Sequence, residues 1–427
     1  MKEMFTINDT LTNKISYYHT LAFLMGLPFD RFYSELVLIS WLLHELIHLK
    51  KKKLSGIRMP LMMTSLLYLV VTISTIYSAD KEQAFKDLQV QLAFLLFPLI
   101  FSVTSLDIRK YSNRLLKAFT LICLITILYL YFDAFRIIRY NKLPFSTLIS
   151  NSFINHNFSL ALQLHATVLS MYITLAAGYL LHRFIHSDKA RERLVYAGGL
   201  LILAAGIFQL SSKAVFIATL IIINILFPLL MLKRQTRWKF MLVSFLVSAL
   251  VITGITQIPT FKERYIAGSR NDLNEVSVRN DLLEPRLMRW QAALKLVQKA
   301  PLIGYGTGTE KKLLKEKYFE NRLFNSYVHE LDAHNQYLSF LIRTGIIGLF
   351  VYLLVLFVAL KRALQTADLV FCVFVTIIAI VSFSENILNF NKGIFFFNFF
   401  YCFFIKANEK YINNAENPTS DQTPAFN

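Results

Sequence analysis

The residues best suited to chemistry lie in one stretch, Pro285–Leu349, which combines arginines, a tryptophan, a glycine-rich turn and a His-Asn pair. Arg286 precedes Trp290 by four residues, so on a helix its guanidinium can lie on or beside the indole. The planar guanidinium fork suits phosphate oxygens, which makes Arg286 and Arg289 candidate anion ligands. The alternative is a solvated helix face with Trp290 resting at a membrane interface.

A histidine follows in the segment Asp332-Ala333-His334-Asn335. An imidazole titrates near neutral pH, so His334 can accept a proton from an attacking hydroxyl. His329 and Glu330 add titratable groups nearby, and we count His329 and Asn335 as candidate substrate contacts. The alternative is that His334 only caps or borders the helix that follows it.

Three further polar sites lie outside this stretch. Lys213, in QLSSKAVF, ends an apolar block, where a cation is costly unless it is paired or functional; the alternative is a lysine that reaches lipid phosphate. Glu385, in SFSENILNF, faces either the same cavity or water. His156-Asn157 either binds a polar ligand or caps a helix, and we favour the cap.

The run HELIH, from His44 to His48, matches the H-E-x-x-H pattern, in which two histidines bind zinc and a glutamate acts as base. Its setting argues against a metal site, because the neighbouring Lys50–Lys53 run would repel a cation and no clear third ligand follows. We therefore interpret these histidines as interfacial residues near lipid headgroups, and we predict no metal and no cofactor.

The elements that must position these residues are strongly apolar. The chain is 55% hydrophobic with a mean hydropathy of +0.47, whereas soluble domains have roughly 45–50% apolar residues. The excess falls in continuous blocks of roughly 18–25 residues, the length of a membrane-crossing helix. This predicts an all-α polytopic membrane protein and not a strand barrel, whose apolar residues would alternate.

We predict about twelve spans. They are 15–27, 31–49, 60–78, 87–105, 115–133, 156–181, 194–211, 213–231, 239–257, 335–360, 368–384 and 392–406. Lysine and arginine concentrate in the even-numbered loops, which the positive-inside rule places in the cytoplasm with both termini. The net charge of +18 therefore reflects orientation, and we predict no nucleic-acid partner.

The predicted organisation has four parts: spans 1–9 in residues 1–257, a large outward loop in 258–334, spans 10–12 in 335–406, and a disordered cytoplasmic tail in 407–427. Within the loop, Leu287, Trp290, Leu294 and Val297 recur at helical spacing and predict an amphipathic helix at 286–299, stopped by Pro301. Residues 309–323 are charged and helix-prone. Between them Gly304, Gly306 and Gly308 predict a turn where the backbone approaches another group closely, and we count Gly304 and Gly306 as candidate substrate contacts.

Together these motifs resemble the O-antigen ligase and Wzy-type polymerase superfamily. PRLMRWQAALKLVQKAPLIGYGTG is similar to that family's Arg-x-x-x-Trp helix and Pro-Leu-x-Gly-x-Gly turn, and AHNQYLSFLIRTGIIGL to its His-Asn-x-Tyr-Leu segment. A long outward loop between the ninth and tenth of twelve spans is also similar. The resemblance is strongest from about 207 to 400.

The resemblance implies a GT-C-like, metal-independent glycosyltransferase, multi-pass in the bacterial inner membrane, with its active site on the periplasmic side. Such enzymes move a glycan from an undecaprenyl-pyrophosphate carrier to lipid A-core or to another lipid-linked glycan. The partners it implies are that donor, the glycan acceptor and membrane lipids. By position, Arg286 would hold the pyrophosphate, His334 would activate the acceptor hydroxyl, and Lys213 would replace the family's arginine, keeping the charge but losing the bidentate fork.

Four functions remain open at this point. The first is an O-antigen ligase-like transferase, and the second is a repeat-unit polymerase of the same superfamily. The third is a polysaccharide transporter or flippase without chemistry. The fourth is a metalloprotease built on the HELIH run, which requires bound zinc.

Overall fold

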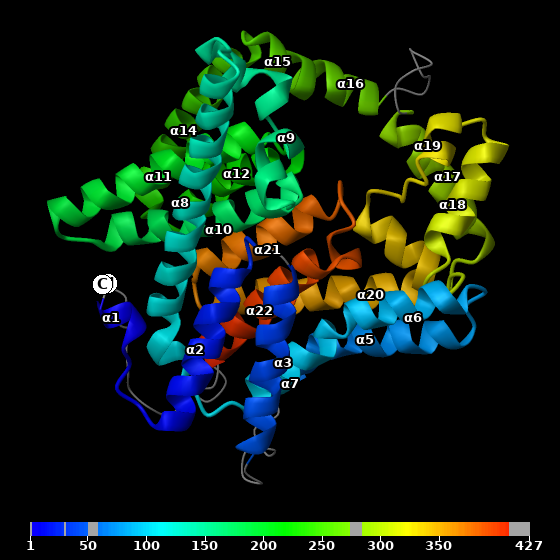
Figure 1. Ribbon diagram of the computed structural model, residues 1–427, viewed down its shortest axis with the longest axis horizontal. Coiled ribbons are helices and arrows are strands. Elements are labelled where there is room, and N and C mark those ends of the chain that lie inside the picture. Colours follow the sequence, from blue (N-terminus) through cyan, green and yellow to red (C-terminus); the bar gives the residue numbers. More distant parts are fainter. Residues whose placement is uncertain (1, 30, 50–58, 274–283, 410–427) are drawn as a thin grey trace.

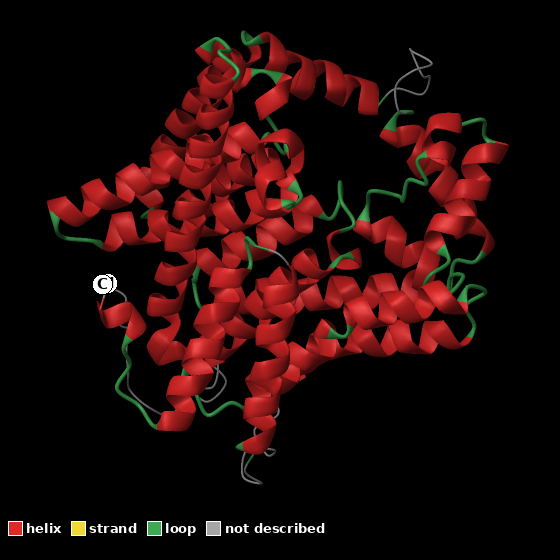
Figure 2. Cartoon of the chain, in the orientation of Figure 1, coloured by secondary structure: helices red, strands yellow, loops and turns green. Residues whose placement is uncertain are grey.

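The computed structural model describes residues 2–29, 31–49, 59–273 and 284–409, and every regular element in these ranges is a helix (Figure 1; Figure 2). Eight of the described helical segments are long and apolar enough to cross a membrane. They are α5 (Met59–Ile76), α6 with α7 (Lys81–Gln91 and Ala93–Val103), α8 (Ile108–Tyr140), α10 (Ala166–His186), α11 (Ala190–Leu210), α12 with η4 and α13 (Lys213–Ile221, Ile222–Leu226 and Phe227–Met231), α14 (Arg234–Thr256) and α20 (Gln336–Gln365). The predicted class, an all-helical chain with several membrane-crossing helices, is confirmed.

The remaining four predicted spans coincide with shorter helices. These are α2 (Leu11–Gly26), α3 (Arg31–Ile47), α21 (Leu369–Val381) and α22 (Asn391–Ala407), with 16, 17, 13 and 17 residues. The count of twelve spans, the orientation and the four-part division therefore stay predictions. The basic run Lys50–Lys53 and the tail from residue 410 lie outside the described residues.

One predicted span, 156–181, begins at the wrong residue. His156–Ser159 form the short helix α9 and Leu160–Leu162 the turn η3, and α10 begins only at Ala166. Gln163 has a φ of 50°, and a left-handed backbone at a non-glycine residue interrupts a helix. The polar residues before Ala166 are therefore free to join a site beside the N-terminal end of α10.

The helix α22 is the centre of the bundle. All of its side chains from Lys392 to Ile405 are buried, as expected for a helix that is apolar on every side. Phe400 packs edge-on against Phe119 of α8, and Phe404 stacks on Phe371 of α21, each with ring centroids 4.9 Å apart. The first contact holds α22 against α8, and the second holds it against α21, so the turn between α21 and α22, which carries Glu385, is anchored to the bundle.

Between α14 and α20, residues 257–273 and 284–335 are described and contain six short helices. They are α15 (Pro259–Lys262), η5 (Glu263–Ala267), α16 (Gly268–Asp272), α17 (Arg286–Lys299), α18 (Glu310–Glu320) and α19 (Phe324–Val328). Figure 1 shows α17, α18 and α19 grouped together, with α15 and α16 on the side of α14. The predicted helix at 286–299 and the helix in the charged run 309–323 are confirmed.

The buried face of α17 differs from the predicted apolar stripe. Leu294 is exposed, whereas Arg289, Ala292, Ala293 and Leu296 are buried. The small alanines let α17 pack closely on its neighbours, and the helix shares a second hydrophobic core with α18 and the start of α20. This rotation carries the Arg289 side chain into the interior.

The glycine turn after α17 packs against α20. Gly304 and Gly306 have φ of 65° and 94°, and α20 is interrupted beside them at Gly345, with φ 63° and ψ −160°. A Cβ added to Gly304 would lie 2.5 Å from the Ile342 carbonyl oxygen, and one added to Gly306 would lie 2.5 Å from Ser78 Cα. Close backbone packing therefore explains both glycines without a substrate contact.

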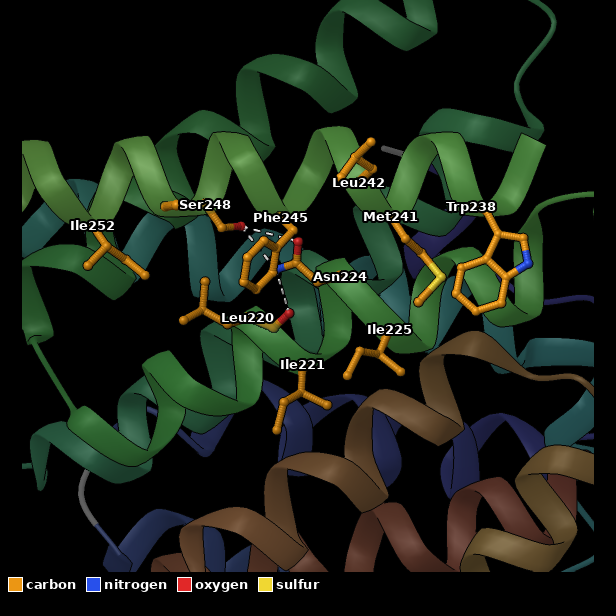
Figure 3. Close-up of a pocket in the computed structure, with 11 residues that line it drawn as sticks. Leu220, Ile221, Asn224, Ile225, Trp238, Met241, Leu242, Phe245, Ser248 and Ile252 are labelled. Atoms are coloured by element: carbon orange, nitrogen blue, oxygen red, sulfur yellow. Dashed lines mark hydrogen bonds between the residues drawn. The ribbon is translucent and has the colours of Figure 1, made fainter. Parts of the chain in front are cut away.

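Helix α14 lies at the edge of the bundle and buries none of its residues. Between it and α12 with η4 runs an apolar groove of about 500 Å³ (Figure 3). Its lining is apolar except for one polar pair, in which the Asn224 side-chain amide donates to Ser248 Oγ at 3.0 Å. The groove extends from Leu220, two turns along the helix that begins with Lys213.

Candidate functional site

His334 lies at the junction of the short helices and α20. The Trp290 indole N–H donates to the Ala333 carbonyl at 3.0 Å, and the His334 backbone N–H donates to Asp332 Oδ1 at 2.9 Å. The φ of His334 is 44°, a left-handed conformation that costs roughly 1–2 kcal/mol and needs surrounding contacts to maintain it. Trp290 thus positions the histidine segment, and its indole N–H is not directed to Arg286.

Two carboxylates face one nitrogen of the His334 ring. Nδ1 is 3.5 Å from Glu385 Oε2 and 3.6 Å from Asp332 Oδ1. These acceptors favour the tautomer with its proton on Nδ1, which leaves the lone pair of Nε2 available. Catalytic hydrogen bonds are often long before substrate binds, so this arrangement suits a general base.

Glu385 links the histidine to Arg286. The guanidinium of Arg286 lies 3.8 Å from Glu385 Oε1, and its Nη1 donates to the Ser384 carbonyl at 2.9 Å. Burial by itself would raise the pKa of Glu385, but the hydrogen bond with His334 and the charges of His165 and Arg286 bring that pKa below its ordinary value. Glu385 is therefore ionised at neutral pH.

Lys213 and Arg286 come together around Asp272, at the end of α16. Lys213 Nζ lies 2.8 Å from Asp272 Oδ2, and Arg286 Nε lies 3.8 Å from Asp272 Oδ1. A Cβ added to Gly268 would lie 3.1 Å from Lys213 Nζ, so the lysine passes directly over the backbone of α16. The N-terminal residues of α12 and α17 thus share one carboxylate.

Two more arginines surround this pair. Arg264 Nε donates to the Ser211 carbonyl at 2.7 Å, and Arg264 interacts electrostatically with Arg286 and Asp272. Arg289 is only 5% exposed, and within the described part of the chain its Nε and Nη1 have no hydrogen-bond partner. A buried donor without a partner costs roughly 1–3 kcal/mol, so an anionic ligand would be favoured here.

His165 was not predicted as a site residue, because the predicted span 156–181 included it within a membrane helix, whereas α10 begins only at Ala166. Its buried Nδ1 has no partner in the described residues, and its ring meets His156 edge-on with centroids 4.3 Å apart. Burial lowers the pKa of His165, and the nearby charge of Glu385 opposes that change. The predicted cap is wrong, because Asn155 is the N-cap residue of α9 and the Asn157 amide donates to the Asn151 carbonyl.

Sequence reasoning also missed Asp272 and Arg264. Both lie in a polar stretch of the sequence, and their spacing to Lys213 or Arg286 matches no motif. Of the other predicted contacts, Asn335 caps α20 by accepting from two backbone N–H groups. His329 is exposed at the end of α19.

The HELIH run has a packing role. Glu45 is fully buried, and its Oε1 accepts from the Ser16 hydroxyl, the Trp41 indole and the Thr104 hydroxyl at 2.6, 3.3 and 2.8 Å. The prediction that both histidines border lipid headgroups is wrong for His44, which is buried. No group of three or more metal-binding side chains occurs in the described ranges.

The fold and the site together define a polytopic helical membrane protein that brings a histidine with carboxylate partners beside a cluster of cations. Residues 198–353 match the family model described as O-antigen ligase, which confirms the family resemblance over this region. The matched region contains Lys213, Arg286 and His334. No curated protein matches the chain.

Proposed function

We propose that the protein is a glycosyltransferase that moves a glycan from an undecaprenyl-pyrophosphate carrier to an acceptor hydroxyl. The observation that carries this proposal is the meeting of Lys213 and Arg286 beside the His334–Glu385 pair. The cations suit a diphosphate leaving group, and the imidazole suits a hydroxyl nucleophile.

In the proposed reaction, Nε2 of His334 takes the proton from the acceptor hydroxyl. The acceptor oxygen then bonds to the anomeric carbon while the bond from that carbon to the phosphate oxygen breaks, and its electron pair leaves with the pyrophosphate. Glu385 stabilises the imidazolium that forms, much as a carboxylate does in a catalytic triad.

Arg286, Lys213 and Arg264 would stabilise the negative charge that develops on the pyrophosphate. The Ser384 and Ser211 carbonyls hold Arg286 and Arg264 in place before substrate arrives. The buried, unpartnered donors of Arg289 would supply further hydrogen bonds. These cations perform the task that a metal ion performs in many phosphate-binding enzymes, so we propose a metal-independent reaction.

Asp272 would occupy the pyrophosphate position until the donor binds. Its two carboxylate oxygens contact the same two cations that we assign to the diphosphate. Donor binding therefore requires the carboxylate to move aside. This exchange keeps the cations paired with an anion whether or not the donor is bound, which limits the free-energy cost of partly burying unpaired charges.

The apolar groove would hold part of the carrier's hydrocarbon chain (Figure 3). Leu220, which lines it, is seven residues from Lys213, or about 10 Å along a helix at 1.5 Å per residue. A carrier with its pyrophosphate at Lys213 could therefore lay its chain between α12 and α14. The proposed setting is the periplasmic face of the bacterial inner membrane.

Purified full-length protein, supplied with carrier-linked glycan and with lipid A-core, tests this proposal. We expect transfer by the wild type and its loss in His334→Ala and in Arg286→Ala, with normal expression and insertion. His186→Ala, at the far end of α10, is the control and should transfer normally. Transfer at the wild-type rate by either site variant would contradict the role given to that residue, and no product from the wild type would favour a transporter or flippase.

The acceptor separates a ligase from a polymerase. In a deletion strain, long carrier-linked glycan that never reaches lipid A indicates a ligase, whereas single repeat units indicate a polymerase. In both cases the roles of Arg286 and His334 are the same.

A further inference from the structure

One carboxylate hydrogen-bonded to the segments that carry the site has no role in the proposed reaction: Glu310, the first residue of α18. It is only 4% exposed, and carboxylates are rarely buried to this extent unless they are paired or fully hydrogen-bonded. The other two buried residues of α18 are Leu314 and Tyr318, which pack in the second hydrophobic core, so Glu310 is the one charged residue on the buried face of this helix. A structural role within α18 alone would not require this carboxylate to point inward.

The contacts of Glu310 lead to both members of the proposed base pair. Its Oε1 accepts from the Ala333 backbone N–H at 3.3 Å and from the Asn386 side-chain amide at 3.1 Å. Ala333 directly precedes His334, and Asn386 directly follows Glu385. One oxygen atom therefore connects the two segments that bring His334 and Glu385 together.

The second carboxylate oxygen, Oε2, accepts from the Ser339 hydroxyl in the first turns of α20. Ser339 Oγ in turn accepts from the Asn389 amide at 3.1 Å, in the same turn that carries Glu385. The Ala333 backbone is held at both ends, because its N–H donates to Glu310 and its carbonyl accepts from the Trp290 indole. These two hydrogen bonds set the direction in which the chain enters His334, whose left-handed backbone needs such support.

We propose that Glu310 is a positioning residue that fixes the distance between His334 and Glu385. The inference rests on the proposed function, since it assumes that His334 is the base. The hydrogen bonds of Glu310 go to Ala333, Asn386 and Ser339 and not to the His334 ring or the Glu385 carboxylate, so it acts through Ala333 and Asn386. A displacement of about 1 Å at a reacting group can cost about 100-fold in rate.

The test compares Glu310→Ala with Glu310→Gln in the full-length protein. Glutamine keeps Oε1 as an acceptor for both Ala333 and Asn386, whereas alanine removes it. Glu310→Ala should lower kcat by about 10- to 100-fold, with the KM for the donor little changed, because the misplaced group is the base. Glu310→Gln should restore most of the wild-type kcat.

Asp368→Ala is the matched control. The Asp368 carboxylate accepts from the Phe371 backbone N–H at 3.0 Å and from the Asn408 side-chain amide at 3.1 Å, the same pair of donor types that Glu310 binds. It lies beyond the other end of α20, which at 1.5 Å per residue is about 45 Å long. Asp368→Ala should change stability without the selective loss of kcat.

A second measurement does not require transfer activity. The rate of carbethoxylation of His334 by diethyl pyrocarbonate, followed by peptide mass spectrometry, reports how firmly the ring is held. It should rise several-fold in Glu310→Ala and stay at the wild-type value in Glu310→Gln and Asp368→Ala. An unchanged kcat together with unchanged carbethoxylation in Glu310→Ala overturns the inference, and an inactive wild type with the expected carbethoxylation pattern overturns only the proposed function.

Discussion

Asp272 offers the sharpest test of how the cationic site is used. Its carboxylate lies 2.8 Å from Lys213 Nζ and 3.8 Å from Arg286 Nε. If those cations bind pyrophosphate, Asp272 competes with the substrate for them. The nearly isosteric change Asp272→Asn removes the competing charge and should therefore tighten pyrophosphate binding.

The size of this effect follows from the geometry of the ion pairs. At 2.8 Å two unit charges attract by about 6 kcal/mol at an effective dielectric constant of about 20. The net value is far smaller because both side chains are about 30% exposed and lose hydration, and measured values for exposed pairs are roughly 0–1 kcal/mol each. Because these side chains are only partly exposed, we take the upper half of that range, about 0.5–1 kcal/mol for each pair. The two pairs together then give about 1–2 kcal/mol, or roughly a 5- to 30-fold increase in affinity.

Isothermal titration with inorganic pyrophosphate at low ionic strength measures this effect without an acceptor. Lys213→Ala should change the affinity in the opposite direction. Glu320→Gln, which removes the exposed carboxylate paired with Lys317, is the control and should leave binding unchanged. An Asp272→Asn protein that binds pyrophosphate no better than the wild type would refute the reasoning.

Three further predictions concern stability. The folded-state pKa of Glu385 lies below its ordinary value of 4.5. Its ionised form therefore stabilises the fold above that pH, and the stabilisation is lost as the pH falls through the lower folded-state value. Glu385→Gln should have a lower Tm than the wild type at pH 7, and the difference in Tm should shrink below about pH 4.5. Gly345→Ala should lower the Tm by several degrees and reduce expression. The added Cβ would lie 2.2 Å from the Leu302 carbonyl oxygen, and the left-handed backbone strain costs of order 1–3 kcal/mol. A normal Tm would show that α20 can straighten at this position. Glu45→Gln should reduce stability without releasing zinc, and a stoichiometric zinc content in the purified wild type would support the metalloprotease hypothesis instead.

The sequence alone predicted the all-helical class, which the structure confirms, and it named Lys213, Arg286 and His334, whose roles stay predictions. In the membrane interior the backbone N–H and C=O groups of a continuous apolar block must hydrogen-bond within the block, so the block forms a helix. The lengths of these blocks predicted most of the long helices in the structure. The roles expected for Arg286 and His334 came from the family resemblance of the motifs that contain them, whereas Glu385, which lies near both, joins them only in the tertiary structure. The span starting at 156 was misplaced because apolar composition does not reveal a left-handed residue such as Gln163.

Only the tertiary structure decided which polar residues meet. Asp272, Glu310 and His165 carry no local signal, and their relation to Lys213, Ala333 and Glu385 arises from segments that are distant in the chain. It also changed the interpretation of Gly304, Gly306 and Asn335, whose backbone and capping contacts are explained by packing. A motif shows which groups are available, whereas the distances between them depend on how the helices pack. That is why Lys213 and Arg286 could be named from the sequence, but Asp272, the carboxylate that they share, could not.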